Sequence, residues 1–395
     1  MSGTAAGTLT IIADDLTGAA DAAGGYGAAR TSAVVLGPEV PWPEPDVLAV
    51  DTESRYLPEH EAAELVAAVV RRSVALGRPV FKKIDSLLRG NVGAEVAAAL
   101  AALTDSDRGL AVVAPAFPGT GRTTVGGVVH VDGVPNEDGE FAGDVAAALA
   151  VAGLRVERLT PDPADGAEQV AARLERLHAE GADAVVLDAV DDDDLDRIAR
   201  ACRLLTTPTL ATGSGGLAAH MVPSDGSAAA PAPPTTSVDR VLVVVGSYSG
   251  PARSQIDELV RRGAEHVELR HRADGEQAAV DQISSAPSDV VLTPDLLVPV
   301  DTANALDVAA ALAATVTRIA HRFDALVLTG GETARAVLDA LGIDTVHVHG
   351  NVEPGVVLST HPDHRPVFVT KAGAFGDAGT LARTVRALRQ QHIEQ

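Results

Sequence analysis

Cysteine, aromatic residues and lysine are all scarce in this sequence of 395 residues. The single cysteine, Cys202, excludes an internal disulfide and leaves no cysteine cluster for a metal, as is typical of a reducing compartment. Aromatic residues make up only 3% of the chain, so we expect cores of alanine, valine and leucine. Lysine occurs only at Lys82, Lys83 and Lys371, whereas arginine is frequent. Lysine is therefore not a default surface residue here, and its positions are informative.

Net positive charge and long apolar runs are missing as well. The net charge of −23 argues against nucleic acid as a partner, because phosphate backbones are bound by basic surfaces. No apolar run approaches the length that spans a bilayer, so we expect no membrane association. The first residues, MSGTAAGTLT, lack the charged and apolar regions of a signal peptide, and we expect a cytoplasmic protein. Any site for an anion must then be a local group of positive side chains.

Short β-branched runs alternate with alanine-rich helical stretches along most of the chain, which predicts an α/β fold with parallel sheets flanked by helices. The expected strands are 8–14, 47–52, 79–85, 110–117, 184–189, 240–247, 289–294, 324–330 and 367–373, and expected helices include 59–76 and 91–103. The four aspartates at 191–194 are expected to cap and charge a helix start.

The alternation breaks at residues 222–238, where proline, alanine, serine and threonine dominate and a linker is predicted. The chain is also longer than one hydrophobic core usually serves. We therefore predict two domains, residues 1–221 and 239–395, each a mainly parallel sheet flanked by helices.

Polar motifs follow the predicted strands of the first half, and in open parallel sheets ligands bind at these carboxyl ends. The first motif, ADDLTGAAD (13–21), places Asp14 and Asp15 at the start of a helix. One carboxylate is enough to cap a helix, so the pair is either a cap or a chemical group. Asp15 is the first candidate for contacting or deprotonating a substrate hydroxyl, and Asp14 is the second.

The second motif, FKKIDSLLRGNVGAE (81–95), holds two of the three lysines at one strand end. Behind them follow Asp85, Ser86 and Arg89. Lys82 and Lys83 point to opposite faces of a strand, so at most one of them is directed at the site. Arg89 could hold a carboxylate through two hydrogen bonds, with Lys83 as a point charge beside it. The alternative is a solvated basic strand end.

The third motif, APAFPGTGRTTVGGVVHVDGVP (114–135), is rich in glycine and predicts a loop and a hairpin. It lacks the Lys-Ser or Lys-Thr of a Walker phosphate loop. Arg122 within it is a second candidate for binding an acid group. Arg55, in DTESRYL (51–57), stands at another strand end and could reach the same cleft, although a surface arginine fits the pattern nearly as well.

Three glycine corners follow strands in the second half: VVVGSYSGPARSQ (243–255), VLTGGETARAVL (327–338) and VTKAGAFGDAGTL (369–381). Glycine permits close approach of the backbone, and helix N-termini offer unpaired N–H groups to phosphates. One such corner is common in α/β proteins, but three in one domain favour a nucleotide site. The candidate ATP-binding residues are Ser247, Gly330, Gly331, Glu332, Thr333, Lys371, Gly373 and Gly376.

As a set, these motifs resemble the four-carbon acid sugar kinase family, formerly a domain of unknown function. The stretches that carry the resemblance are ADDLTGAAD, KKIDSLLRGNVGAE, APAFPGTGRTT, VGSYSGPARSQ, LTGGETA and KAGAFG, which run in the family's order. The resemblance implies an N-terminal domain for the sugar acid and a C-terminal domain for ATP. It implies that the acid faces Asp15, Arg55, Lys83, Asp85, Ser86 and Arg89. It also implies that ATP faces Ser247, residues 330–333 and Gly373.

The sequence departs from the family pattern at three positions. The family usually has a small polar residue where Leu87 stands, and a serine and an asparagine where Ala372 and Ala374 stand. Leu87 bears on which acid is used. The two alanines bear on side-chain contacts to the nucleotide, though not on backbone contacts.

The combined hypothesis is transfer of the γ-phosphoryl group of ATP to the terminal hydroxyl of threonate, erythronate, a 3-oxo-tetronate or a similar acid. Mg²⁺ would bridge the phosphates, with protein ligands that the sequence does not reveal. Closure of the domains about the linker would exclude water. One alternative is a non-catalytic binding protein for acidic metabolites. Another is an NAD(P)-dependent dehydrogenase, but no GxGxxG follows the first strand. A homo-oligomer is compatible with the sequence.

Overall fold

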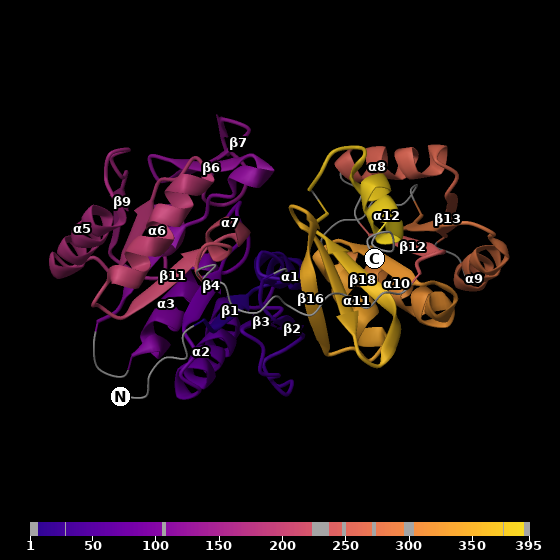
Figure 1. The fold of residues 1–395 in the computed structure, drawn as a ribbon, viewed down its shortest axis with the longest axis horizontal. Helices are drawn as coiled ribbons and strands as arrows, with labels where there is room; N and C mark the ends of the chain where they lie inside the picture. Colours follow the sequence, from indigo (N-terminus) through magenta and orange to yellow (C-terminus); the bar gives the residue numbers. More distant parts are fainter. Residues whose placement is uncertain are drawn as a thin grey trace. The chain divides into compact units, whose positions relative to one another are not determined.

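A computed structural model of the chain describes residues 7–27, 29–104, 108–222, 237–246, 250–270, 274–295, 304–373 and 375–390. The chain divides into two compact units, Met1–Ala228 and Ala229–Gln395, and each is described by itself (Figure 1). Apart from its ends, the predicted linker at 222–238 lies outside the described residues.

The first unit is built on a sheet in which neighbouring described strands run parallel, in the order β2-β3-β1-β4-β11-β5-β10-β9. Its strands are β1 Leu9–Ala13, β2 Ser32–Val35, β3 Val47–Asp51, β4 Val80–Lys83, β5 Leu110–Ala114, β9 Val156–Leu159, β10 Ala184–Leu187 and β11 Thr209–Gly213. A small antiparallel sheet, formed by β6 Arg122–Val125, β7 Val128–Val131 and β8 Val134–Pro135, follows β5.

Helices cover both faces of this sheet, which explains why strands such as β1 are buried along their whole length. One face packs through a shared core of valine, leucine and alanine against α2 Glu59–Ala75, α3 Val92–Leu103 and α4 Val145–Ala150. The other face carries the neighbouring helices α1 Leu16–Gly24, α7 Gly215–Ala218, α6 Asp192–Leu204 and α5 Ala167–Ala179. A short 3-10 helix, Pro118–Thr120, precedes β6.

The second unit has the strand order β13-β14-β12-β15-β18-β17-β16, in which the pairs from β13 to β18 are parallel and the last two are antiparallel. Its strands are β12 Val241–Val245, β13 Glu265–Leu269, β14 Val290–Pro294, β15 Ala325–Thr329, β16 Thr345–Glu353, β17 Val356–His361 and β18 His364–Lys371.

Helices flank this second sheet as well. Two helices, α8 Gly250–Arg261 and α12 Thr380–Gln390, pack on one face through the apolar core. The remaining helices are α9 Gly275–Ser285, α10 Ala305–Ile319 and α11 Gly331–Ala340, with a 3-10 turn at Ala320–Arg322.

The predicted fold class is confirmed, since both units are mainly parallel sheets flanked by helices. Most predicted strands extend past the carboxyl ends of the observed strands. The prediction counted the loop residues directly behind each apolar run as part of the strand. Asp191 caps α6 by accepting a hydrogen bond from the backbone N–H of Asp194, as predicted. No helix within the described ranges is long and apolar enough to cross a membrane.

The two adjacent lysines of β4 point to opposite faces, as the strand period predicted. Lys82 lies on the α3 face, where its Nζ is 2.7 Å from Oε2 of Glu95, and both side chains are almost fully buried. Lys83 lies on the α1 face, where a Cβ added to Gly18 would be 2.9 Å from its Nζ. Only Lys83 is therefore directed at the loops that follow β1.

We predict that Lys82→Met lowers the free energy of unfolding by roughly 3–5 kcal/mol, because Glu95 then becomes an unpaired buried carboxylate. The double variant Lys82→Met/Glu95→Leu should recover most of this loss in urea unfolding. A matched control is Arg108→Ala, which breaks the half-exposed pair with Asp183 and should cost about 0–1 kcal/mol. A loss in Lys82→Met no larger than in this control would contradict the assignment.

Candidate functional site

The predicted acid-binding residues of the first unit gather at the end of the sheet where its parallel strands terminate, which we call its carboxyl edge. β3, β1 and β4 are parallel neighbours, so the loops that follow them emerge side by side. The loop after β1 carries Asp14 and Asp15, the loop after β3 carries Arg55, and the loop after β4 carries Asp85 and Arg89. The structure thus brings together residues that lie far apart in the sequence.

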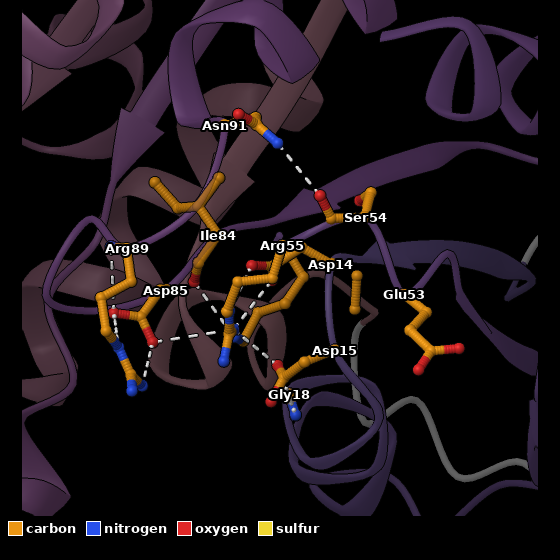
Figure 2. A network of polar contacts seen from close by, with 12 residues as sticks. Asp14, Asp15, Gly18, Glu53, Ser54, Arg55, Ile84, Asp85, Arg89 and Asn91 are labelled. Carbon is orange, nitrogen blue, oxygen red and sulfur yellow. Dashed lines mark hydrogen bonds and ion pairs between the residues drawn. The ribbon is translucent and has the colours of Figure 1, made fainter. Parts of the chain in front are cut away.

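Arg55 joins the three aspartates of this edge (Figure 2). Its Nε is 2.7 Å from Oδ2 of Asp14, and its Nη2 donates to Oδ1 of Asp14 at 3.1 Å and to Oδ1 of Asp15 at 2.7 Å. The same Nη2 lies 3.7 Å from Oδ2 of Asp85. Since only 9% of the Arg55 side chain is exposed, these ion pairs are largely shielded from water.

Asp15 both caps a helix and belongs to this charged group, so the two interpretations of the aspartate pair are compatible. It is the N-cap of α1, and its Oδ1 accepts from the N–H of Gly18 at 3.1 Å. Its Oδ2 accepts from the hydroxyl of Thr17 at 2.6 Å. Gly18 has to be small, because a Cβ there would press on both Asp15 and the Lys83 ammonium.

Arg89 is already paired within the chain. Its Nε and Nη2 donate to the two oxygens of Asp85 at 3.1 and 2.7 Å. A guanidinium has five N–H donors, so this pairing leaves the edge formed by Nη1 and Nη2 for another carboxylate. The Arg89 side chain is 60% exposed and accessible for such a contact. Ser86 is buried in the same loop.

Arg122 lies at the start of β6 and is also buried, with its Nη1 donating to the carbonyl of Thr120 at 2.9 Å. Burial lowers the pKa of Arg122, and the negative charge of Asp85 acts against this shift. Arg122 is therefore within electrostatic reach of the Asp85–Arg89 pair, as expected for a second cation at this edge.

The surrounding charges keep the carboxylates ionised. Burial alone would raise the pKa of Asp14, but Arg55 together with the two lysines holds it below its ordinary value. Burial would likewise raise the pKa of Asp85, but the positive charges of Arg89 and Arg55 outweigh burial and lower this pKa. The pKa of Arg55 is well above its ordinary value, because its three aspartate partners outweigh burial.

Cations gather among the carboxylates of this edge. Arg55, Lys83, Arg89 and Arg122 lie among Asp14, Asp15 and Asp85, and Asp51 and Glu53 belong to the strand end and loop that carry Arg55. The Lys82–Glu95 pair is neutral as a unit and faces the other way. In a chain of net charge −23, such a concentration of cations is the feature that an anion site requires.

The predicted nucleotide residues gather in the same way at the carboxyl edge of the second sheet. β12, β15 and β18 are parallel neighbours, and the glycine corners follow these three strands. The N–H of Gly330 donates to the carbonyl of Lys371 at 2.9 Å, which ties two corners together. Gly246 approaches Thr333 so closely that any Cβ would overlap its hydroxyl.

The corner after β15 opens directly into a helix. Gly330 has φ of +91° and is the N-cap of α11, where a residue with a side chain would be strained. Gly331, Glu332 and Thr333 form the first turn of α11, whose N–H groups suit an anion. Ser247, the candidate from the corner after β12, lies outside the described residues.

Lys371 ends β18 and is almost fully buried. Its Nζ donates to the carbonyls of Ala372 at 3.0 Å and Gly373 at 3.3 Å. Burial lowers the pKa of Lys371 to about 8, with the charge of Glu353 opposing part of this shift. Gly376, further along the same corner, has φ of +86°.

Sequence reasoning missed three polar residues behind the charged edge of the first unit, namely Ser54, Asn91 and Glu95 (Figure 2 shows the first two). Asn91 and Glu95 belong to the motif at 81–95, but their partner Ser54 comes from a different strand end. No group of three or more histidine, cysteine or acidic residues suited to a metal ion occurs among the described residues.

Comparison with known proteins relates both parts of the chain to known domain families. Residues 9–221 match the model of a sugar-binding N-terminal domain, and residues 242–381 match that of a nucleotide-binding C-terminal domain. The D-threonate kinase of Cupriavidus necator is 38% identical over 96% of this chain and 98% of the relative. The chain belongs to the four-carbon acid sugar kinase family. This result confirms the resemblance that the motifs indicated. It also confirms the prediction of a kinase, rather than a dehydrogenase or a non-catalytic binding protein.

The four-carbon acid sugar kinases also include a D-erythronate kinase of Heliobacterium modesticaldum, which is 29% identical over 95% of this chain and 96% of the relative. A solved structure from Salmonella typhimurium is 23% identical, with a TM-score of 0.79 over 96% of this chain and 99% of that one. At this identity the solved structure shows the shared fold alone.

The depressed pKa of Lys371 leads to a prediction of pH-dependent nucleotide binding. Lys371 loses its proton as the pH rises through about 8, so the dissociation constant of ATP should increase above that pH. Titration calorimetry between about pH 6.5 and 9.5 would measure it. Lys371→Arg keeps its charge over this range and should flatten the dependence. An identical pH profile in both proteins would exclude Lys371 as the titrating group.

Proposed function

We propose that this chain transfers the γ-phosphoryl group of ATP to the terminal hydroxyl of D-threonate or a closely related four-carbon acid. Residues 1–221 bind the acid and residues 239–395 bind ATP. The observation that carries the proposal is the Arg55-centred group of charges, with the cations Lys83, Arg89 and Arg122 close by, at the carboxyl edge of β3, β1 and β4. D-threonate is the first candidate because the relative named for it is 38% identical, against 29% for the one named for D-erythronate.

The carboxylate of the acid binds to the accessible edge of Arg89, with Lys83 and Arg122 as further cations. A bidentate arginine gives such a contact both strength and orientation. Asp85 and Ser86 lie beside Arg89 in the same loop and contact the hydroxyls of the acid.

Asp15 orients or deprotonates the terminal hydroxyl. Asp14 is less suited, because Arg55 holds both of its oxygens and only 4% of its side chain is exposed. The Asp15 side chain is 15% exposed and accepts a hydrogen bond from Arg55 through Oδ1 alone. In phosphoryl transfer the positioning of the hydroxyl counts for more than the basicity of the group that holds it.

The phosphates of ATP bind at the glycine corners of the second unit. The N–H groups at the start of α11 and the ammonium of Lys371 supply positive charge, and Ser247, Gly373 and Gly376 border the same corners. Mg²⁺ bound to the phosphates would neutralise the charge that develops during transfer. Such an ion keeps several waters and needs few protein ligands, and Glu332 in the first turn of α11 is the carboxylate that could contact it.

The proposal predicts turnover of D-threonate in a coupled assay of ADP release with ATP and Mg²⁺. Among D-threonate, L-threonate, D-erythronate and 3-oxo-tetronates, D-threonate should have the highest kcat/KM, by about tenfold or more. A difference of this size is about 1.4 kcal/mol of transition-state binding, which a few contacts supply. No turnover of any of these acids, together with no thermal shift on addition of ATP, would refute the kinase activity.

Arg89→Ala should raise the KM for the acid about 10- to 100-fold while changing the KM for ATP by less than about threefold, because a lost charged hydrogen bond costs about 1.5–3 kcal/mol. Steady-state kinetics with each substrate varied in turn gives both constants. Arg108→Ala is the matched control, since this arginine also pairs with an aspartate but lies away from the site. Equal increases in both KM values would place the carboxylate elsewhere.

A further inference from the structure

The loop that carries Arg55 is held in an unusual backbone conformation. It leaves β3 at Asp51, and Glu53 has φ of +48°, in the left-handed region that residues with side chains rarely adopt. Such conformations persist only where the surroundings determine them. At its start the N–H of Thr52 donates to the carbonyl of Ala13 at 2.9 Å, and the N–H of Arg55 donates to the carbonyl of Asp14 at 3.3 Å.

A buried chain of polar side chains fixes this loop from the α3 side of the sheet. The hydroxyl of Ser54 donates to Oε1 of Glu95 at 2.6 Å, while Oε2 of Glu95 pairs with Lys82 at 2.7 Å. The Thr52 hydroxyl lies 2.8 Å from that of Ser54 and 2.9 Å from the carbonyl of Ala13. Ser54 and Thr52 are both buried, so water does not replace these bonds.

A second contact holds the far end of the loop. The side-chain amide of Asn91, the N-cap residue of α3, donates to the carbonyl of Ser54 at 3.0 Å (Figure 2). It also donates to the carbonyl of Leu57 at 2.9 Å. The loop is therefore bound at Thr52, Ser54 and Leu57, on both sides of Arg55. These hydrogen bonds of Ser54, Asn91 and Glu95 do not involve the guanidinium of Arg55.

We propose that Glu95, Ser54 and Asn91 are positioning residues that set the place of Arg55 and, through it, of Asp14 and Asp15. The inference rests on the proposed function, in which these aspartates and their neighbours bind the acid. Arg55 reaches three carboxylates at once, so a small displacement of its backbone cannot preserve all three ion pairs. A misplacement of about 1 Å is enough to impair catalysis strongly.

The test uses the full-length protein and the pair Ser54→Ala and Ser73→Ala. Both serines are completely buried in the first unit, but the hydroxyl of Ser73 has no hydrogen-bond partner among the described residues. Ser54→Ala should raise the KM for D-threonate about tenfold or lower kcat by a similar factor, with the KM for ATP within about twofold. Ser73→Ala should leave all three constants within about twofold. Ser54→Thr, which restores a hydroxyl, should recover at least half of the loss on a logarithmic scale.

A second readout does not require turnover. The Nε–H of Arg55 is buried against Asp14, so its resonance in an arginine side-chain ¹⁵N spectrum should exchange slowly with water. Assigned by its loss in Arg55→Lys, this resonance should shift or exchange faster in Ser54→Ala and Asn91→Ala, but not in Ser73→Ala. If no acid is turned over by the wild type, the proposed function fails, and this resonance still decides the positioning role. An unchanged resonance, or the same kinetic constants in Ser54→Ala and Ser73→Ala, would overturn the inference.

Discussion

The charged edge of the first unit depends on one guanidinium. Arg55 pairs with Asp14 and Asp15 and lies close to Asp85, so three carboxylates share one buried cation. Without it, the two adjacent carboxylates at the end of β1 would repel each other, and only the two lysines would oppose the effect of burial on Asp14. Arg55 is the main reason why the pKa of Asp14 falls rather than rises on burial, and it supports Arg89 in lowering the pKa of Asp85. Removing the guanidinium would thus change the charge of the site as well as its shape.

Because the charged edge depends on Arg55, the loop that carries Arg55 is held by several buried polar side chains. Glu53, two residues before Arg55, lies in the left-handed region, and the loop would relax if nothing held it. Ser54 is bonded to Glu95, and Glu95 is bonded to Lys82, so the loop is anchored to both β4 and α3. A buried ion pair adds little to stability relative to apolar residues, but it defines geometry sharply. The Lys82–Glu95 pair is therefore best understood as a contact that fixes the geometry of the loop.

Much of this edge could be predicted from the sequence, because parallel strands end together and polar residues at their ends therefore meet. The opposite directions of Lys82 and Lys83 followed from the strand period alone. The pairing of Ser54 with Glu95 could not be predicted, because it depends on β3, β1 and β4 being neighbours in the sheet. Local sequence patterns do not reveal the order of strands in a sheet. The edge strand β9 was missed for a different reason: its sequence, VERL, is largely exposed and lacks an apolar run.

The cations of this edge contrast with the charge of the whole chain, which bears on turnover in the proposed reaction. The chain carries −23 overall, whereas Arg55, Lys83, Arg89 and Arg122 are concentrated at one place, so attraction for an anion is confined to short range by screening. The phosphorylated product would carry about 1.5–2 more negative charges than the acid. Arg55 is committed to aspartates, and Arg89, Lys83 and Arg122 are the cations proposed for the carboxylate, so none of the four is left for the new phosphate group. Because the chain as a whole repels the product more strongly than the acid, its overall charge favours release of the phosphate ester.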